Sequence, residues 1–188
     1  MHALLLLLVL ATGTLAGERP PVPMDRIAWE TENLLPPRNP ERVRLRLYTI
    51  ARNGVTQSSR LVMYGDVWQR RLEVPLYEVQ GEELKAASLC DLNDDGIQEV
   101  LLQFAPPLQQ SLTRLVVFSY GRRARRYVKI FEQGPAPRLR ARWVVLSERR
   151  NALGERGLAV DELKEDGYTP ARTTVYRFQG ERLHPVLR

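Results

Sequence analysis

Charged and apolar residues alternate strictly over Arg42–Tyr48, which reads Arg-Val-Arg-Leu-Arg-Leu-Tyr. Successive side chains of a strand point to opposite faces, so this alternation predicts a β-strand with one buried face and one solvated face. Asn53-Gly54 follows, and both residues tolerate the positive φ that a two-residue hairpin turn requires. The sequence therefore predicts a hairpin in which Arg60–Tyr64 is the returning strand.

Short extended patterns of this kind recur along the rest of the chain, with turn signals about every 8–12 residues. Only Asn33–Leu35 and Gln80–Leu89 have compositions compatible with a helix, and both are short. We therefore predict a mainly β domain over residues 41–188, built from antiparallel meanders and hairpins and arranged like propeller blades or as a small sandwich. The predicted strands are Arg42–Tyr48, Arg60–Tyr64, Val67–Leu72, Pro75–Val79, Val100–Phe104, Leu112–Tyr120, Tyr127–Phe131, Arg142–Leu146, Thr173–Phe178 and Arg182–Leu187.

Two segments precede this domain. Residues 1–16 contain an unbroken apolar run, Ala3–Leu10, followed by small residues, which predicts a secretory signal peptide cleaved after Ala16. The alternative is an uncleaved membrane anchor, for which the uncharged stretch only reaches the lower limit of about 17 residues. Residues 17–40 hold six of the 13 prolines, so we predict a Pro-rich extended leader with at most one helical turn, over Arg26–Leu34.

The signal peptide predicts a secreted or periplasmic protein with no transmembrane span after cleavage. Two hairpin-like segments, LVVFSYGRRARRYVKIF at 115–131 and TTVYRFQGERLHPVL at 173–187, resemble each other, and each follows an Asp-Gly dipeptide, at 95–96 and at 166–167. They are either a duplicated unit or two ordinary hairpins.

Carboxylates gather in one stretch of an otherwise basic chain. The sequence has 28 Lys and Arg against 22 Asp and Glu, a net charge of +6. Asp91, Asp94, Asp95 and Glu99 nevertheless lie within nine residues, just before the apolar run Val100–Phe104. Like charges repel when they are crowded, so the pattern indicates either an acidic turn in water or a site for a cation.

The spacing of these residues favours a cation. Asp91, Asn93 and Asp95 occupy alternate positions, and a curled loop aims such side-chain oxygens inward, with Gly96 allowing the sharp turn that follows. Oxygen ligands without nitrogen or sulfur favour Ca²⁺ over zinc or copper. The predicted calcium ligands are Asp91, Asn93 and Asp95 through their side chains, Ile97 through its backbone carbonyl, and Glu99 directly or through a water.

The stretch Asp91–Leu102, DLNDDGIQEVLL, matches the first half of an EF-hand loop but has Leu102 where the bidentate Glu of an EF-hand belongs. Because an apolar strand follows instead of a helix, the stretch resembles the calcium loop of FG-GAP/VCBS-type repeats, D-x-[DN]-x-D-G-x-x-[DE]. The resemblance covers about a dozen residues and lacks the Phe-Gly and Gly-Ala-Pro signatures. The resemblance implies calcium held inside or between the blades of a β-propeller, in proteins that are often adhesive or carbohydrate-associated.

Arg122, Arg123, Arg125 and Arg126 form the predicted tip of another hairpin. Such a tip is either a solvated turn or a contact for an anionic cell-envelope polymer or lipid headgroup, because guanidinium groups pair with anionic oxygens. A nucleic acid partner is not expected, since the sequence shows no stacking platform. Another envelope protein is a further possible partner.

Few residues support catalysis. His184 is the sole imidazole once the signal peptide is removed, and Cys90 is the sole cysteine, which we interpret as a small buried apolar residue. No pattern points a nucleophile at His184, so we predict a non-enzymatic, envelope-associated interaction module with one structural calcium. Two alternatives remain: an adhesion or polyanion-binding module that uses the arginine hairpin, and a hydrolase that uses carboxylates.

Overall fold

In the computed structural model, the described residues are 24–32, 34–36, 42–67, 70–107, 113–134, 140–146, 157–164, 169–179 and 182–186. These ranges contain strands and turns but no helix, and accordingly none that has the length and hydropathy of a membrane span. The predicted signal peptide, residues 1–16, and the Asp-Gly at 166–167 lie outside them.

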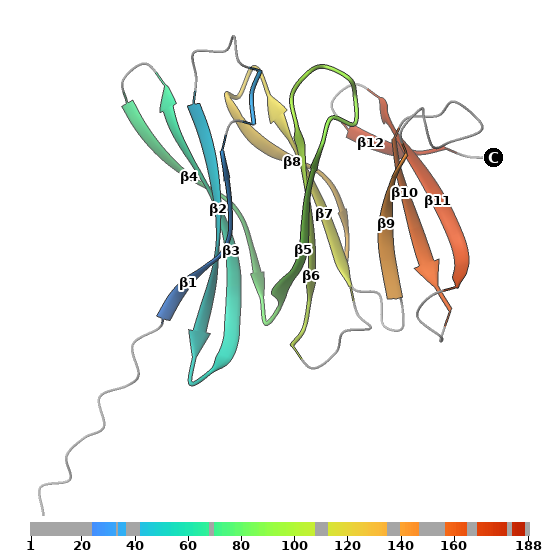
Figure 1. The fold of residues 1–188 in the computed structure, drawn as a ribbon, viewed down its shortest axis with the longest axis horizontal. Coiled ribbons are helices and arrows are strands. Elements are labelled where there is room, and N and C mark those ends of the chain that lie inside the picture. Colours follow the sequence, from blue (N-terminus) through green and yellow to red (C-terminus); the bar gives the residue numbers. More distant parts are fainter. Residues whose placement is uncertain are drawn as a thin grey trace, which may run out of the picture.

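The strands form three antiparallel sheets of four, and in each sheet neighbours in the chain are neighbours in space. Figure 1 shows the three meanders as successive layers. The mainly β prediction is confirmed, and the arrangement is a stack of three blade-like sheets, not a sandwich of two. The first sheet is β1 (Met24–Glu32), β2 (Arg42–Arg52), β3 (Val55–Val67) and β4 (Arg70–Gln80); the second is β5 (Glu83–Cys90), β6 (Glu99–Ala105), β7 (Arg114–Gly121) and β8 (Arg126–Gln133); the third is β9 (Arg140–Leu146), β10 (Gly157–Leu163), β11 (Pro170–Gln179) and β12 (Arg182–Pro185).

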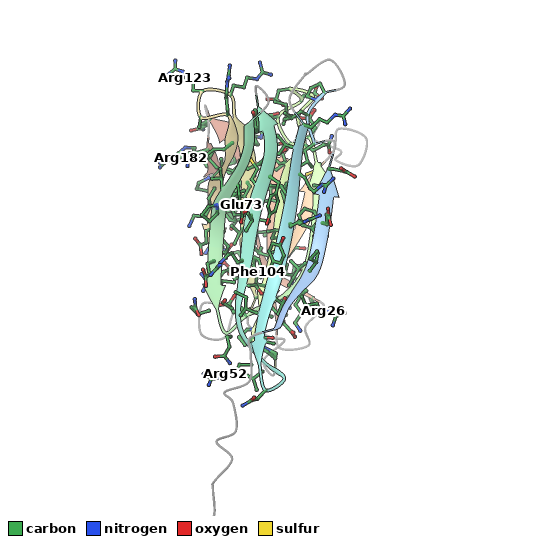
Figure 2. All side chains as sticks on the ribbon, turned by 90° about the vertical axis from the view of Figure 1, so that its left-hand side faces the viewer. Arg26, Arg52, Glu73, Phe104, Arg123 and Arg182 are labelled. Carbon is green, nitrogen blue, oxygen red and sulfur yellow. The ribbon has the colours of Figure 1, made fainter. Side chains whose placement is uncertain are left out.

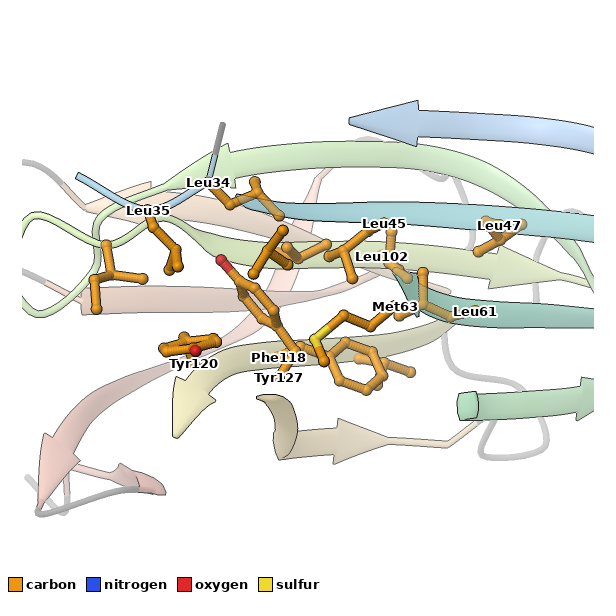
Figure 3. Close-up of a cluster of buried hydrophobic side chains, with 14 of the residues drawn as sticks. Leu34, Leu35, Leu45, Leu47, Leu61, Met63, Leu102, Phe118, Tyr120 and Tyr127 are labelled. Carbon is orange, nitrogen blue, oxygen red and sulfur yellow. The ribbon is translucent and has the colours of Figure 1, made fainter. Parts of the chain in front are cut away.

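The second sheet is buried on both faces, which explains the nearly continuous apolar sequence of β6 and β7. Val100, Leu102 and Phe104 face the first sheet and belong to the first core, between the first and second sheets. Leu101, between them in the strand, faces the opposite way into the second core, between the second and third sheets. All four side chains are completely buried. Figure 3 shows the first core, with leucines of the first sheet against Phe118 and Tyr127 of the second.

The first sheet keeps the alternation that its sequence predicts. Leu45 and Leu47 of β2 are fully buried in the first core. Arg44 and Arg46, which alternate with them, lie on the outer face and both pair with Glu30 of β1, and Arg44 also pairs with Glu32. The hairpin from β2 to β3 turns at Asn53-Gly54, with φ of 53° and 73°. Because both φ values are positive, the turn matches the twist of the flanking strands, as predicted.

Residues 24–32 differ from the prediction of an extended leader with a helical turn over Arg26–Leu34. They form β1, which pairs antiparallel with β2, so the sheet begins before the predicted domain boundary at residue 41. The prolines at 20, 21, 23, 36, 37 and 40 all flank the strand and none interrupts it. The ladder therefore loses no N–H donor.

The helix considered over Gln80–Leu89 is also wrong, since Glu83–Cys90 is β5, paired with β6. The apolar pattern of this short segment is compatible with a helix or a strand, and its pairing with the buried strand β6 favours the strand. Strand β10 was not predicted, because Asp161 and Glu162 break its apolar run. Asp161 is buried in the structure, where it accepts a hydrogen bond from the Thr173 hydroxyl at 2.7 Å.

The two similar segments occupy equivalent places, because β7–β8 and β11–β12 are the third and fourth strands of their sheets. The two Asp-Gly dipeptides are not equivalent in the topology. Residues 95–96 lie between the first and second strands of the second sheet, whereas residues 166–167 lie in sequence between the second and third strands of the third sheet.

A polar cluster joins the first sheet to the second beside their shared core. Arg114 of β7 binds both oxygens of Glu82, with Nε–O distances of 3.1 and 3.2 Å, and its Nη1 lies 2.7 Å from Glu132 of β8. Tyr77 of β4 donates its hydroxyl to the same Glu132 at 2.8 Å. The paired contacts of Arg114 fix the orientation of Glu132, and the Tyr77 hydroxyl bound to that carboxylate holds β4 against β8.

Replacing either Leu101 or Leu102 by Ala is expected to lower the free energy of unfolding by about 2–5 kcal/mol, because each leaves a cavity in a different core. The measurement is urea unfolding followed by circular dichroism. Leu89→Ala in the neighbouring strand is the control: this side chain is 39% exposed, and its loss is expected to cost less than about 1 kcal/mol. A small effect of either core substitution would contradict burial on both faces.

Candidate metal centre

The loop Asp91–Gln98 joins β5 to β6 at one end of the second sheet and is anchored in both cores. Leu92 packs in the second core and Ile97 in the first, and both are about 5% exposed or less. The end of the loop is also fixed through Gln98, whose N–H donates to the Leu34 carbonyl at 3.2 Å and whose carbonyl accepts from the Tyr127 hydroxyl at 2.9 Å. The acidic segment is therefore held at both of its ends.

The three side chains predicted as ligands curl around the loop's own backbone. Asp91 accepts the N–H of Asp95 at 3.1 Å on one oxygen and the N–H of Gly96 at 2.8 Å on the other. Asn93 accepts the same Asp95 N–H at 3.1 Å, and Asp95 in turn accepts the N–H of Ile97 at 2.8 Å. Each ligand oxygen of this kind has two lone pairs, so these contacts orient the oxygens and leave acceptor capacity for a cation.

Two residues of the loop have positive φ, which makes the curl possible. Gly96 has φ of 81°, and a Cβ placed on it would come no closer than 3.7 Å to Pro36. Glycine is therefore favoured there by backbone conformation and not by space. Asp94 has φ of 64° and is exposed. Asp and Asn are among the few residues that adopt this conformation readily, which gives a structural reason for the acidic residue that the predicted ligand set leaves out.

Glu99 lies beneath the loop at the start of β6 and is completely buried. Its carboxylate accepts the Leu92 N–H at 2.7 Å and the Ser119 hydroxyl at 2.8 Å. Burial raises the pKa of Glu99 to about 7, against the lowering effect of these two hydrogen bonds. The carboxylate thus ties the start of the loop to β6 and β7, as well as standing at the predicted ninth position of the site.

The donor set fits calcium in chemistry, since it consists only of oxygens on a curled backbone. Within the described ranges, no three His, Cys, Asp or Glu side chains converge on one point. The site predicted from the sequence therefore requires the Asn93 amide oxygen, the Ile97 carbonyl and water beside the Asp carboxylates, with Glu99 contributing directly or through a water. Leu102, at the twelfth position, is fully buried in the first core, so this position faces away from any EF-hand-like site.

The arginine hairpin lies beside the loop. Arg122 approaches Asp95 with an Nη2–Oδ2 distance of 3.7 Å, and its side chain is 71% exposed. Arg123, Arg125 and Arg126 are also exposed, and Arg125 has φ of 49° at the turn. An ion pair this exposed contributes little to stability. The structure thus brings together two groups of opposite charge that the sequence analysis treated as separate.

Sequence reasoning missed the residues that support the loop from other strands. Ser119 and Tyr127 belong to the β7–β8 hairpin, and both bind the end of the loop through hydrogen bonds. The register that pairs Val100 with Phe118 brings Ser119 close to Glu99. This register is a long-range property, and the sequence carried no local signal for it.

The residues considered for catalysis lie on different strands. Cys90 ends β5, and burial together with the nearby Glu99 and Asp91 carboxylates raises the pKa of its thiol to about 12, which disfavours the reactive thiolate. His184 is exposed on β12. A groove of about 670 Å³ on the outer face of the first sheet has Glu73 and Glu78 in its lining. Glu78 pairs with Arg60 at 3.1 Å, and that hydrogen bond lowers the pKa of the Glu78 carboxyl.

Comparison of the chain with protein-family models, curated proteins and solved structures finds no match in any of the three.

Ser119→Ala is expected to lower the free energy of unfolding by about 1.5–3 kcal/mol, since it removes a hydrogen bond to a buried carboxylate. The measurement is urea unfolding in the presence of a chelator, so that bound metal does not contribute. Ser88→Ala, in β5 at the edge of the same sheet, is the control and is expected to have an effect below about 0.5 kcal/mol. Equal effects of the two substitutions would show that the contact with Glu99 contributes nothing.

Proposed function

We propose that the protein is an exported, non-enzymatic β-rich module in which one calcium ion, bound at the loop Asp91–Glu99, acts as a structural staple. The observation that carries the proposal is that backbone N–H groups of the loop bind the side-chain oxygens of Asp91, Asn93 and Asp95, with Asp91 and Asn93 meeting at the same N–H. Carboxylates crowded in this way gain from a cation between them. The order of loop and then buried strand, within a blade-like meander, supports the resemblance to FG-GAP/VCBS-type repeats.

The proposed ion would be held by Asp91, Asn93 and Asp95, by the Ile97 carbonyl, and by Glu99 directly or through a water. It would supply positive charge that offsets the repulsion among the carboxylates. Since the loop has one anchor in each core, an ion that orders the loop would stabilise both interfaces of the second sheet. Binding to the folded state alone raises stability by mass action.

Location and partners are proposed from the sequence of residues 1–16, which has the pattern of a secretory signal peptide. An exported protein meets millimolar calcium more often than a cytosolic one does, and extracellular modules bind calcium with Kd values of about 10⁻⁴–10⁻³ M. The proposal is therefore consistent in chemistry and compartment, with a cell-envelope component as partner. No described contact favours the carboxylate-based hydrolase, which stays a prediction.

Calcium at about 10 mM is expected to add about 1.4–2.7 kcal/mol of stability at the Kd values above, and so to raise Tm by about 3–10 °C relative to chelator. Asp95→Asn is expected to remove this shift, because it takes away a charged ligand. The measurement is thermal unfolding by circular dichroism with calcium and with chelator.

Asp94→Asn is the matched control for that substitution, because it makes the same change one residue away at an exposed position. It is expected to keep the calcium-induced shift. If wild type shows no shift, or if both variants lose it equally, the proposed site is wrong.

A second candidate function is binding of an anionic envelope polymer by the hairpin Arg122–Arg126. The observation that favours it is the exposure of all four arginines at one turn. Among the described residues, Arg123 and Arg126 have no carboxylate partner. Guanidinium groups left unpaired in water can bind the anionic groups of a polymer in bidentate fashion.

Replacing Arg122, Arg123, Arg125 and Arg126 by Gln is expected to lower the salt concentration at which the protein elutes from immobilised heparin, used here as a linear polyanion. The control removes the same total charge elsewhere, through Gln at the exposed residues Arg26, Arg42, Arg52 and Arg172. If the two variants elute together, net charge alone accounts for retention, and the hairpin is no specific contact.

A further inference from the structure

We infer that the polyanion site extends from the second sheet onto the third, and that it binds a linear anionic polysaccharide. The surface consists of Arg122, Arg123, Arg125 and Arg126 at the β7–β8 turn and Arg182 at the start of β12, and we call it the basic corner. The inference rests on the second candidate function above and adds a residue, a second sheet and a class of partner to it.

The packing of β8 against the third sheet brings the start of β8, at Arg126, and the start of β12, at Arg182, to the same end of the molecule. Phe131 of β8 contacts Tyr176 of β11, with ring centroids 4.8 Å apart. Closer to the β7–β8 turn, Val128 of β8 packs against the second core, which includes Leu183 of β12. Arg126 lies two residues before Val128, at the start of β8, and Arg182 lies one residue before Leu183, at the start of β12. Both arginines therefore lie beyond this contact, toward the same end of the second core.

Figure 2 agrees with this path, since Arg123 and Arg182 lie close to one end of the molecule while Arg52 lies at the other. Direct contact between β8 and β12 also supports it. Arg126 and Arg182 begin strands of different sheets, so the arginines are spread along an edge that crosses the stack and are not gathered at one point. A chain-like anion matches that spread better than a single small anion does.

Three arginines of the basic corner differ in their pairing from those of the first sheet. On the outer face of that sheet, Arg44 and Arg46 both bind Glu30, with N–O distances of 3.3 and 3.1 Å. Within the described ranges, Arg123, Arg126 and Arg182 have no such carboxylate. At the corner, the guanidinium groups of Arg123, Arg126 and Arg182 are therefore available to an anion, whereas the two arginines of the sheet face are neutralised by Glu30.

The aromatic residues near the corner argue against a nucleic acid partner. Tyr120 and Tyr127 flank the arginine turn but are 7% and 1% exposed, and their rings pack together in the first core, with centroids 5.5 Å apart. Single-stranded nucleic acids need exposed rings on which bases stack. The corner offers charge without a stacking surface, which suits a polymer that carries anionic groups and no bases.

The positions of the exposed apolar side chains argue against a lipid membrane as the partner. The exposed large apolar side chains of the described ranges are Ile27, Val55 and Leu89, and none of them lies on either hairpin of the corner. Stable membrane binding usually combines basic residues with an apolar group that enters the lipid. Bidentate pairing of guanidinium with carboxylate or sulfate needs no such group, so we assign the corner to an anionic polysaccharide.

Arg182→Gln in the mature full-length chain tests the extension onto the third sheet, with fluorescently labelled heparin as the probe and anisotropy as the measurement. We expect affinity to fall about fivefold for one arginine that faces a dense anionic surface, and the slope of log K against log salt to fall by about one. Arg52→Gln, with the same loss of charge at the opposite end, is expected to leave both unchanged.

Arg182→Lys checks that the effect comes from charge at this position, and it is expected to recover most of the salt dependence. Equal affinity of the Arg182→Gln and Arg52→Gln variants would overturn the extension and leave the Arg122–Arg126 hairpin standing as the site. If the four-arginine variant also binds heparin normally, both proposals fail. Tighter binding of single-stranded oligothymidylate, or of vesicles with anionic lipid, than of heparin would overturn the choice of partner.

Discussion

Burial of both faces of the second sheet is the constraint on which the rest of the structure depends. Leu101 and Leu102 are adjacent in β6, point into different cores and are both fully buried. A strand in this position has no solvated face, so each neighbouring sheet must supply a complete apolar surface. The first sheet does so by strict alternation in β2, which leaves its arginines outside in ion pairs with Glu30 and Glu32.

The same constraint places the acidic loop. The loop between β5 and β6 connects two strands of a sheet that is covered on both faces. Its apolar residues therefore pack in the two cores, Leu92 in the second and Ile97 in the first. The polar residues between them are left to bind one another and the backbone. Glu99 is the exception: its carboxylate is buried among strands and is tolerated because the Leu92 N–H and the Ser119 hydroxyl both donate to it.

Local patterns in the sequence predicted the parts of this structure that depend on local physics. Alternation identified β2, the Asn53-Gly54 turn identified its hairpin, and the spacing of Asp91, Asn93 and Asp95 identified the curl of the loop. Prediction failed where pairing over long distances decides. Strand β1 is a strand because β2 has a free edge beside it, and the role of Ser119 depends on the register of β6 with β7. Propensity alone carries neither fact.

Anchoring one loop in two cores has a consequence for how distant parts of the molecule affect each other. A ligand that stabilises the loop also favours close contact of all three sheets, because the loop keeps this conformation only while Leu92 remains packed in the second core and Ile97 in the first. Coupling free energies are reciprocal. A substitution deep in either interface between sheets, far from the carboxylates, would then change the affinity of the loop for its ligand. The measured affinity would therefore report on the stability of the packing between the sheets.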